Sequence, residues 1–347
     1  MIIKGDILSE SIGIIGAGSW GIALAYLLSG NGEDVTVWSR SEENVHKLRT
    51  DHENKDKLPG VILDESVKFT SSLEEAVSGK DIIVIVVPSS HVRSICSQIK
   101  PYLSTDPNVR QVIVNCSKGI EEGSLMIMTD VILDELPGTD VAVLSGPSHA
   151  EEVGKGMPTT IVVGAFDKDT ALYIQKVFMN DAFRVYISPD MLGIEVGAAL
   201  KNVIALAAGI ADGLGYGDNT KAALVTRGIT EIARLGIAMG GTFETFCGLS
   251  GIGDLVVTCA SMHSRNRRAG ILIGQGKTAS EAMDEVHMVV EGVYSAKAAL
   301  ELAHKYEVDM PIVEQINAVL FENKPAKEAV QQLMVRDPKI EMHNIDW

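Results

Sequence analysis

A glycine-rich turn between a predicted strand and a predicted helix constrains the fold of this chain more than any other feature. The run IGIIG at residues 12–16 is β-branched and continues into the sequence GAGSWG. Residues 23–32 then predict a helix that ends in a glycine-containing turn, and DVTVWSR at 34–40 predicts a second strand. A strand, a crossover helix and a second strand in this order form the repeating unit of a doubly wound parallel sheet.

The same alternation continues through the first half of the chain. DIIVIVVP at 81–88 is apolar on both faces, which is typical of a central parallel strand covered by helices. Further strands are predicted at 111–119, 141–147, 159–165 and 183–187, and helices at 89–102, 124–136 and 168–179.

Beyond Ser188 the pattern becomes helical. Helices are predicted at 193–213, 218–239, 264–275, 293–306 and 325–335, while DLVVTC at 254–259 is ambiguous between strand and helix. We therefore predict an α/β fold class. An N-terminal Rossmann-type doubly wound domain spans 1–190, and an all-helical C-terminal domain spans 191–347.

The three glycines Gly16, Gly18 and Gly21 have the spacing of a dinucleotide-binding turn, G-x-G-x-x-G. The first permits a tight turn, the second lets the backbone approach a pyrophosphate, and the third lets helix and strand pack closely. The helix N-terminus then faces the anionic group. Because the motif follows a strand and begins a helix, it predicts a dinucleotide cofactor rather than an ordinary glycine-rich turn.

The tip of the second strand indicates which dinucleotide binds. NAD sites usually carry Asp or Glu there for the ribose 2′-hydroxyl, whereas NADP sites often carry an arginine. Here Arg40 ends the strand, and acids come only at Glu42 and Glu43. A guanidinium suits a 2′-phosphate through paired hydrogen bonds, so NADPH is the expected cofactor and NADH the alternative. The competing interpretation of Arg40 is a solvated loop residue.

The bulk composition limits the partners and the compartment. The 347-residue chain carries a formal net charge of −16, which argues against nucleic acid or an anionic membrane as the main partner. Its four cysteines have neither CxxC nor zinc-type spacing, so we expect free, mostly buried thiols, no metal and a reducing compartment. The N-terminus lacks the apolar region of a signal peptide. We therefore expect a cytoplasmic protein, without membrane insertion, that binds a small molecule.

A lysine lies inside the most apolar predicted helix. In GIEVGAALKNVIALAAGIADG at 193–213, most neighbours of Lys201 at helical spacing are small, and the polar residues argue against a membrane span. A buried charge is costly unless it pairs with a carboxylate, for which Glu195 and Asp254 are candidates. A desolvated lysine beside a cofactor also suits general acid–base catalysis, because its pKa approaches the working pH. The alternative is a structural ion pair.

Two polar motifs follow predicted strands, at the edge where open α/β sheets bind ligands. Lys118 lies in NCSKGIEEG, where the alternative is a solvated loop lysine. In SGPSHAEEV, Gly146 could offer its backbone and Ser148 its hydroxyl. His149 could act as an acid or base, or as an orienting or packing residue.

A basic cluster begins the predicted helix at 264–275. Ser264 resembles an N-cap, which places Arg265 and Asn266 in the first turn. A helix N-terminus favours anions, so Arg265, Arg267 and Arg268 need a compensating anion, and a guanidinium there makes a phosphate clamp. The alternative is a solvated basic patch.

Together these stretches resemble one enzyme family. GAGSWG, SKGI, SGPSHAEEV, EVGAALKNVIALAAGIADGLGYGDNTKAAL, GLSGIGDLVVTC and HSRNRRAG occur in order, and they are similar to the bacterial-type NAD(P)H-dependent glycerol-3-phosphate dehydrogenases. The resemblance implies reduction of dihydroxyacetone phosphate to sn-glycerol 3-phosphate, which feeds phospholipid synthesis. It also implies a helical second domain similar to that of 6-phosphogluconate dehydrogenase.

The resemblance also assigns roles to individual residues. It implies that Lys201 donates a proton to the carbonyl oxygen, or accepts one in reverse, with Asp254 beside it in the catalytic site. The implied substrate contacts are Lys118, Gly146, Ser148, Lys201, Asp254, Ser264, Arg265 and Asn266. The implied cofactor contacts are Gly16, Gly18, Ser19, Trp20, Gly21, Arg40, Lys118, Ala150, Arg265, Val289 and Glu291. The apolar helices of the second domain make a homodimer the expected assembly.

Two features depart from the family pattern, and two other functions compete. Roughly ten residues precede the first strand, more than in the family, and Ser148 stands where the animal branch carries asparagine. A β-hydroxyacid dehydrogenase would also join a Rossmann domain to helices and use a lysine, although the SRNRR clamp favours a phosphorylated substrate. A regulatory NADPH-binding module would not need Lys201.

Overall fold

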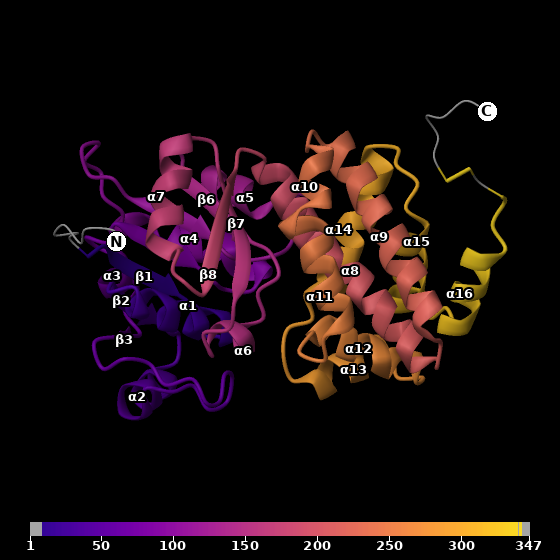
Figure 1. Ribbon diagram of the computed structural model, residues 1–347, viewed down its shortest axis with the longest axis horizontal. Coiled ribbons are helices and arrows are strands. Elements are labelled where there is room, and N and C mark those ends of the chain that lie inside the picture. Colours follow the sequence, from indigo (N-terminus) through magenta and orange to yellow (C-terminus); the bar gives the residue numbers. More distant parts are fainter. Residues whose placement is uncertain (1–8, 339, 342–347) are drawn as a thin grey trace.

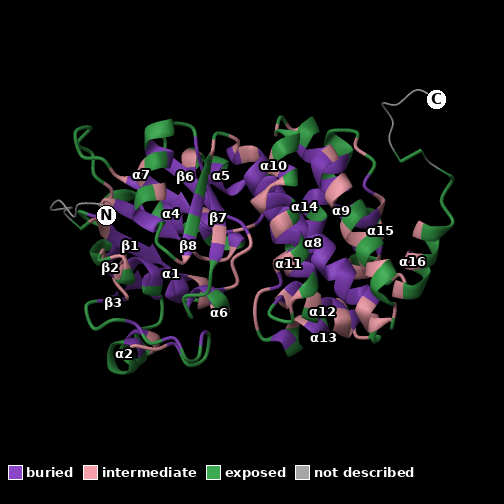
Figure 2. Ribbon diagram, in the orientation of Figure 1, coloured by how far each residue is buried: buried purple, intermediate pink, exposed green. Residues whose placement is uncertain are grey.

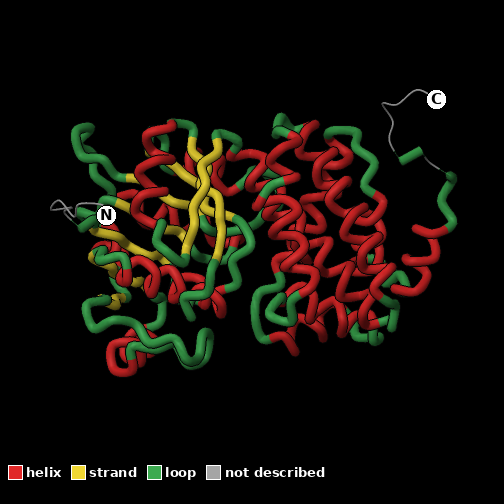
Figure 3. The backbone as a smooth tube through the Cα atoms, viewed as in Figure 1, coloured by secondary structure: helices red, strands yellow, loops and turns green. Residues whose placement is uncertain are grey.

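The computed structural model describes residues 9–338 and 340–341 (Figure 1). Strands occupy the N-terminal half, helices form the C-terminal half, and the two halves lie side by side (Figure 3). Most of the N-terminal extension, residues 1–8, lies outside the described residues. The fold class expected from the sequence, a doubly wound sheet followed by a helical region, is confirmed.

In the described part of the chain, eight strands form one sheet in the order β3-β2-β1-β4-β5-β6-β7-β8. Their bounds are β1 (Ser11–Ile15), β2 (Asp34–Trp38), β3 (Lys68–Thr70), β4 (Ile82–Ile85), β5 (Val112–Asn115), β6 (Asp140–Ser145), β7 (Thr159–Ala165) and β8 (Phe183–Ser188). The strands from β3 to β6 run parallel, whereas β7 pairs antiparallel with β6 and parallel with β8. The strand order reverses between β1 and β4, where a ligand crevice is expected at the carboxyl ends.

Helices bury both faces of this sheet. Along β4, Ile82 and Val84 face the core under α1 (Ser19–Gly30) and α7 (Lys168–Phe178). Ile83 and Ile85 point to the other face of the sheet, where they belong to a second hydrophobic core. The remaining helices of this half are α2 (Glu42–Asp51), α3 (Leu73–Val77), α4 (Val92–Ile99), α5 (Met128–Glu135) and α6 (Ala150–Val153). Because successive side chains of a strand point to opposite faces, an all-apolar run such as β4 requires cover on both sides.

The C-terminal half packs around one central helix, α8 (Met191–Gly213), which is buried along most of its length (Figure 2). Its length and composition would allow it to cross a membrane, but its apolar window is entirely buried inside the protein. The other helices of this half are α9 (Asp218–Ala238), α10 (Phe243–Cys247), α11 (Asp254–Ala260), α12 (Arg265–Gly274), α13 (Ala279–Val286), α14 (Glu291–Lys305), α15 (Pro311–Phe321) and α16 (Ala326–Met334). The apolar sequence of α8 is therefore explained by helices on all sides.

Glycines let α8 and α12 pack backbone against backbone. A Cβ at Gly209 would lie 2.1 Å from the Arg267 carbonyl oxygen, and a Cβ at Gly270 would lie 2.2 Å from the Leu206 carbonyl oxygen. A second pair of glycines repeats the contact one turn further along. The helices could not approach this closely with any larger residue, so the contact fixes the basic first turn of α12 against the lysine-bearing helix.

One ambiguous segment is resolved and one strand was not expected. DLVVTC is helical, as α11, because its buried residues Asp254, Leu255, Thr258 and Cys259 recur at helical spacing. The β-branched residues favour a strand, but packing against α8 overrides this preference. The strand β3 escaped prediction because three residues are too few to show a period of two.

Replacing Gly270 with alanine should lower the free energy of unfolding by roughly 1–3 kcal/mol, because the added Cβ forces α8 and α12 apart. Urea denaturation followed by circular dichroism measures the change. The matched control is Gly30→Ala at the end of α1, where nothing lies within 4 Å of the added Cβ and stability should change little. Equal stabilities of the two variants would contradict the close packing.

Candidate active site

The glycine-rich turn lies at the carboxyl end of β1. Gly16 has φ +129°, and a Cβ there would lie 2.7 Å from the Val86 carbonyl oxygen. A Cβ on Gly21 would lie 1.9 Å from the Gly16 carbonyl oxygen, so helix and turn are in direct contact. Nothing lies within 4 Å of a Cβ at Gly18. The three positions therefore fit a tight turn, an open approach for a ligand, and close packing.

The first turn of α1 is open to an anion. Gly18 is the N-cap and has no side chain to occupy the helix end, and the first turn holds no acidic residue. The backbone N–H groups at Ser19 and Trp20 belong to this uncapped end, while the Trp20 ring packs against the sheet core. These features fit the pyrophosphate of a dinucleotide.

A buried asparagine that the sequence did not reveal holds this turn in place. Asn54 is 4% exposed, and its Nδ2 donates to the Ala17 carbonyl oxygen at 2.9 Å. Its Oδ1 accepts from the Lys57 N–H at 3.1 Å. The residue lies in a polar loop 37 positions beyond its partner, and no local pattern signals the contact.

Arg40 is exposed just beyond β2, while the acids that follow it are engaged in local contacts. Glu42 accepts a hydrogen bond from the Ser71 hydroxyl, and Glu43 pairs with Lys47 at 2.8 Å. Among the residues that the structure describes, no carboxylate pairs with Arg40. The guanidinium is therefore the available charged group at this strand tip, as a 2′-phosphate site requires.

A buried carboxylate joins lysines from the two halves of the chain. Asp254 begins α11, and it accepts from Lys201 Nζ at 2.5 Å through Oδ1 and from Lys118 Nζ at 2.7 Å through Oδ2. Lys201 also donates to Thr258 Oγ1 at 2.8 Å. Asp254 is 1% and Lys201 6% exposed. Of the two partners expected for Lys201, Asp254 is confirmed, and Glu195 is wrong because it bonds to other groups.

Burial sets the protonation of this cluster. It lowers the pKa of Lys201 to about 8, an effect that the Asp254 carboxylate opposes and the Lys118 charge reinforces. For Asp254, burial acts to raise the pKa, but the two lysines outweigh it and hold the pKa below its usual value. The carboxylate is therefore ionised near neutral pH, whereas Lys201 has a pKa close to neutral pH. A group that gives and takes a proton needs this property.

A turn before α11 brings Asp254 to Lys201. Residues Leu249–Gly253 form one turn of π-helix, interrupted by the non-helical Gly251. The Ser250 carbonyl oxygen of this turn would lie 2.9 Å from a Cβ on Gly197, one turn before Lys201. The small residues around Lys201 thus allow another segment to approach α8 closely.

The SGPSHAEEV motif adjoins the lysine cluster. Lys118 Nζ donates to the Gly146 carbonyl oxygen at 3.3 Å, and Ser148 Oγ donates to the same oxygen at 2.9 Å. Burial lowers the pKa of His149, and the Lys201 charge lowers it further. His149 Nε2 is buried without a hydrogen-bond partner among the described residues. The structure therefore brings Lys118, Gly146 and Ser148 together.

The first turn of α12 begins with a partly buried arginine, Arg265. Ser264 caps the helix by accepting from the Arg267 N–H at 3.2 Å, as predicted. Burial lowers the pKa of Arg265, while the charges of Glu291 and Glu151 oppose the effect. No acceptor within the described residues bonds to Arg265. A partly buried guanidinium at a helix N-terminus, without a bonded carboxylate, suits an anionic ligand.

The other arginines of this cluster differ from the expectation. Arg267 does not need an external anion, because its Nε and Nη2 bond to Asp212 Oδ2 of α8 at 2.8 and 2.7 Å. Arg268 is exposed. The partner of Arg267 comes from a different helix, which sequence spacing does not reveal.

Asn266 links three helices. Its Nδ2 donates to Asn202 Oδ1 of α8 at 2.9 Å, and its Oδ1 accepts from the Gly292 N–H of α14 at 2.8 Å. A contact with substrate would use the second hydrogen on Nδ2 or the second lone pair on Oδ1. Because Asn202 follows Lys201 in sequence, this link places the first turns of α12 and α14 beside the lysine-bearing segment.

The remaining predicted cofactor residues lie at the starts of α14 and α6. Glu291 accepts from Ser89 N–H at 3.2 Å and from Ser89 Oγ at 2.6 Å, which ties α14 to the segment that follows β4. Burial raises the pKa of Glu291, and the bonds from Ser89 oppose this. Val289 is partly buried just before α14. Ala150 is buried at the start of α6, which packs against α1.

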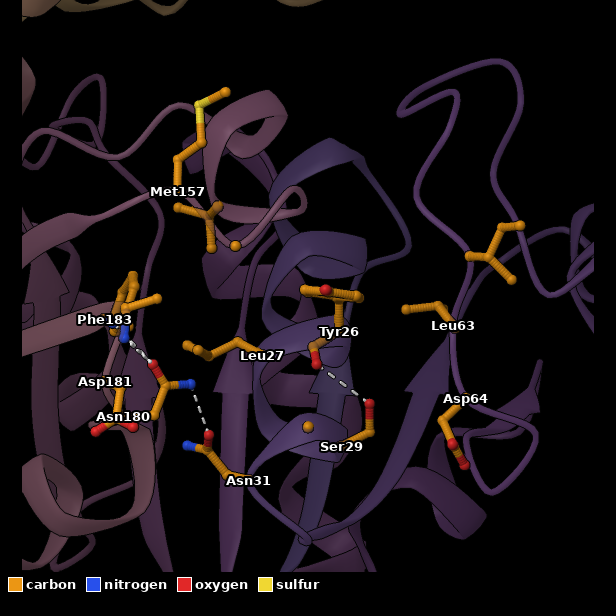
Figure 4. Close-up of a pocket in the computed structure, with 15 residues that line it drawn as sticks. Tyr26, Leu27, Ser29, Asn31, Leu63, Asp64, Met157, Asn180, Asp181 and Phe183 are labelled. Atoms are coloured by element: carbon orange, nitrogen blue, oxygen red, sulfur yellow. Dashed lines mark hydrogen bonds between the residues drawn. The ribbon is translucent and has the colours of Figure 1, made fainter.

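A cavity of about 720 Å³ lies elsewhere, on the strand-containing half (Figure 4). Its lining includes Tyr26 and Asn31 at the C-terminal end of α1, together with Asn180 and Phe183. The polar groups bond to one another: Asn180 Nδ2 donates to Asn31 Oδ1 at 2.8 Å. The lining contains no residue of the predicted site, so this cavity is not the catalytic crevice.

A Rossmann half with an open pyrophosphate turn, joined to a helical half with a buried lysine, defines a nicotinamide-dependent dehydrogenase of two-domain architecture. Two family models match the chain. NAD-dependent glycerol-3-phosphate dehydrogenase N-terminus matches residues 11–171, and the corresponding C-terminus matches residues 190–331. The chain therefore belongs to the NAD-dependent glycerol-3-phosphate dehydrogenase family.

Individual relatives agree with this assignment. The chain is 61% identical to glycerol-3-phosphate dehydrogenase (NAD(P)+) of Fusobacterium nucleatum, covering 96% of this chain and 99% of the relative. It is 49% identical to the enzyme of the same name from Bacillus subtilis, covering 97% of each. The crystal structure of glycerol-3-phosphate dehydrogenase from Coxiella burnetii superposes with a TM-score of 0.90 at 36% identity, covering 94% of this chain and 99% of that one.

Arg40→Ala should weaken NADPH binding about tenfold or more and leave NADH binding within about twofold, because a hydrogen bond to a charged group contributes roughly 1.5–3 kcal/mol. Fluorescence titration with each reduced cofactor measures both Kd values. Lys47→Ala on α2, which removes an exposed lysine paired with Glu43, is the matched control and should change neither. An equal loss for both cofactors would contradict a contact with the 2′-phosphate.

Proposed function

We propose that this protein catalyses the reversible, NAD(P)H-dependent reduction of dihydroxyacetone phosphate to sn-glycerol 3-phosphate. The observation that carries the proposal is the Asp254 cluster, which holds a buried lysine with a lowered pKa beside a dinucleotide-binding half. Relatives named glycerol-3-phosphate dehydrogenase (NAD(P)+), which are 61% and 49% identical over nearly their full lengths, support it.

We assign the cofactor to the crevice between β1 and β4. The glycine turn and the uncapped N-terminus of α1 fit the pyrophosphate, and Arg40 fits the 2′-phosphate of NADPH, with NADH as the second cofactor. Lys118, Ala150, Arg265, Val289 and Glu291 would border its other end. When bound, the reduced cofactor supplies a hydride to the substrate's carbonyl carbon.

Lys201 moves the proton in this scheme. Its ammonium has three N–H groups, of which Asp254 and Thr258 engage two, leaving one for the carbonyl oxygen. Negative charge developing on that oxygen is stabilised by the ammonium and then neutralised by proton transfer. In the reverse direction the neutral amine accepts the proton from the alcohol. Asp254 holds Lys201 in place through both steps.

The remaining polar residues would bind the rest of the substrate. Arg265, with Ser264 and Asn266, offers a guanidinium at a helix N-terminus, which suits the phosphate. Lys118, Gly146 and Ser148 would border the other side. The binding energy of the phosphate holds the reacting carbon in position and so lowers the activation barrier for hydride transfer.

The alternatives account for less of the site. A β-hydroxyacid dehydrogenase would use a lysine and an arginine, but it needs no second lysine on the same carboxylate. A regulatory NADPH-binding module gives no reason to gather a buried lysine and a partly buried one around Asp254, because such a cluster costs desolvation energy.

We further propose a setting for the reaction. The product would feed glycerophospholipid synthesis in the cytoplasm. The four cysteines are free, and three of them are buried, which fits a reducing compartment.

We place the domain boundary at residue 190, between the end of β8 at Ser188 and the start of α8 at Met191. We also propose a homodimer that forms through the helical domain.

Lys201→Ala should bind NADPH with a Kd within about threefold of wild type but lose turnover of dihydroxyacetone phosphate by a factor of roughly 10² or more, because the proton donor is gone. Cofactor fluorescence and absorbance at 340 nm measure the two properties. Lys221→Ala, which removes another lysine paired with a carboxylate, should retain turnover within about threefold. Full turnover by Lys201→Ala would overturn the mechanism and leave the regulatory interpretation.

The kcat/KM for ketone reduction should fall as the pH rises through about 8, because Lys201 must carry a proton and burial brings its pKa to about 8. In Asp254→Asn the fall should move to lower pH, since the carboxylate that favours the protonated lysine is lost. Asp212→Asn, which removes a carboxylate paired with Lys221 and Arg267, should leave its position unchanged. The same pH dependence in all three proteins would contradict the assignment to Lys201.

A further inference from the structure

Glu195 is a deeply buried carboxylate that the proposed reaction does not use. It lies on α8, it is 3% exposed, and its partners come from the strand-containing half. Asn115 Nδ2, at the end of β5, donates to Glu195 Oε1 at 2.7 Å. Thr129 on α5 donates its N–H to both carboxylate oxygens, at 3.2 and 3.1 Å, and its hydroxyl to Oε2.

Asn115 extends this contact to the turn after β5, which carries Lys118. Its Oδ1 accepts from the Ser117 N–H at 3.0 Å, and its Nδ2 donates to the Ser117 carbonyl oxygen at 3.1 Å. Ser117 Oγ in turn donates to the Val87 carbonyl oxygen at 2.6 Å. The next residue is Lys118. A continuous chain of hydrogen bonds therefore runs from α8 to the backbone that carries Lys118.

A contribution to stability does not explain why a carboxylate is buried at this position. Burial raises the pKa of Glu195 to about 7, against the pull of its hydrogen bonds, so the site disfavours the charged form. Buried polar groups commonly give way to apolar side chains without loss of stability when their partners are replaced too. A desolvated carboxylate at this junction is better explained by the geometry it imposes.

The α8 helix and the turn after β5 are linked at two points, by the Glu195–Asn115 hydrogen bond and by the two lysines on Asp254. Glu195 and Lys201 share the rigid helix α8, and Asn115 and Lys118 share the turn after β5. Both lysines meet on Asp254 at the far end. We propose that Glu195 is a positioning residue, which sets Lys118 against Lys201 by holding Asn115. This inference rests on the proposed roles of the two lysines in the site.

Glu231 provides a matched control. It is also a buried glutamate of the helical half, and burial raises its pKa to about 7 as well. Its Oε1 accepts from the Ile312 N–H at 2.9 Å, and within the described residues its hydrogen bonds go to the start of α15 rather than to the turn that carries Lys118. Removing either carboxylate should lower stability, but only the loss of Glu195 should weaken substrate binding.

The first experiment compares Glu195→Leu, Glu195→Gln and Glu231→Leu by thermal unfolding and steady-state kinetics. In Glu195→Leu, the KM for dihydroxyacetone phosphate should rise about tenfold or more, while kcat and the Kd of NADPH change less than about threefold. Glu195→Gln should restore the KM to within about threefold, because the amide oxygen still accepts from Asn115. Glu231→Leu should lower Tm and leave the KM unchanged. Equal KM values for Glu195→Leu and wild type would overturn the inference.

A second pair of variants tests the same inference if Glu195→Leu does not fold. Asn115→Ala breaks the path to Lys118, whereas Thr129→Val removes only a hydroxyl on the other side of the carboxylate. The KM for dihydroxyacetone phosphate should rise in Asn115→Ala alone, and equal KM values in both would overturn the inference. A raised KM in Lys118→Ala but not in Asn115→Ala would overturn only this inference. An unchanged KM in Lys118→Ala would overturn the proposed substrate contact as well.

Discussion

The proposed active site depends on a single buried carboxylate. Asp254 is 1% exposed, and its two oxygens accept hydrogen bonds from Lys118 and Lys201. Moving a carboxylate out of water is costly, and these cations compensate for it. Because the lysines come from the turn after β5 and from α8, the cluster can form only when the two halves of the chain are in contact. The charged site and the junction between the halves are therefore one structural feature.

The same cluster explains how an acidic protein can hold an anionic substrate. The chain has a formal net charge of −16, yet two ammonium groups share one carboxylate here. Arg265 adds a guanidinium without a bonded acceptor among the described residues. The local excess of positive charge suits a phosphate and a developing alkoxide. Burial, together with the charge of Lys118 and against the pull of Asp254, lowers the pKa of Lys201 to about 8.

Local features of this protein could be predicted from sequence, but pairings between distant segments could not. The glycine turn and the alternation of strands and helices have signals within a few residues, so the fold class followed from them. A lysine in an apolar helix is equally visible. Its partner was not decidable, because Glu195 and Asp254 are both acids and only the fold directs Glu195 to Asn115. Asn54 was missed for the same reason, since its partner lies 37 positions away.

The most direct test of the excess positive charge compares two ketones. Purified wild-type protein with NADPH would be assayed by absorbance at 340 nm with dihydroxyacetone phosphate and with unphosphorylated dihydroxyacetone. We predict rapid NADPH oxidation with the phosphorylated ketone and a kcat/KM at least roughly a thousandfold lower without the phosphate, because Arg265, to which no acceptor among the described residues bonds, would then lack an anionic partner. Comparable kcat/KM values for the two ketones would contradict a site built around an anionic substrate.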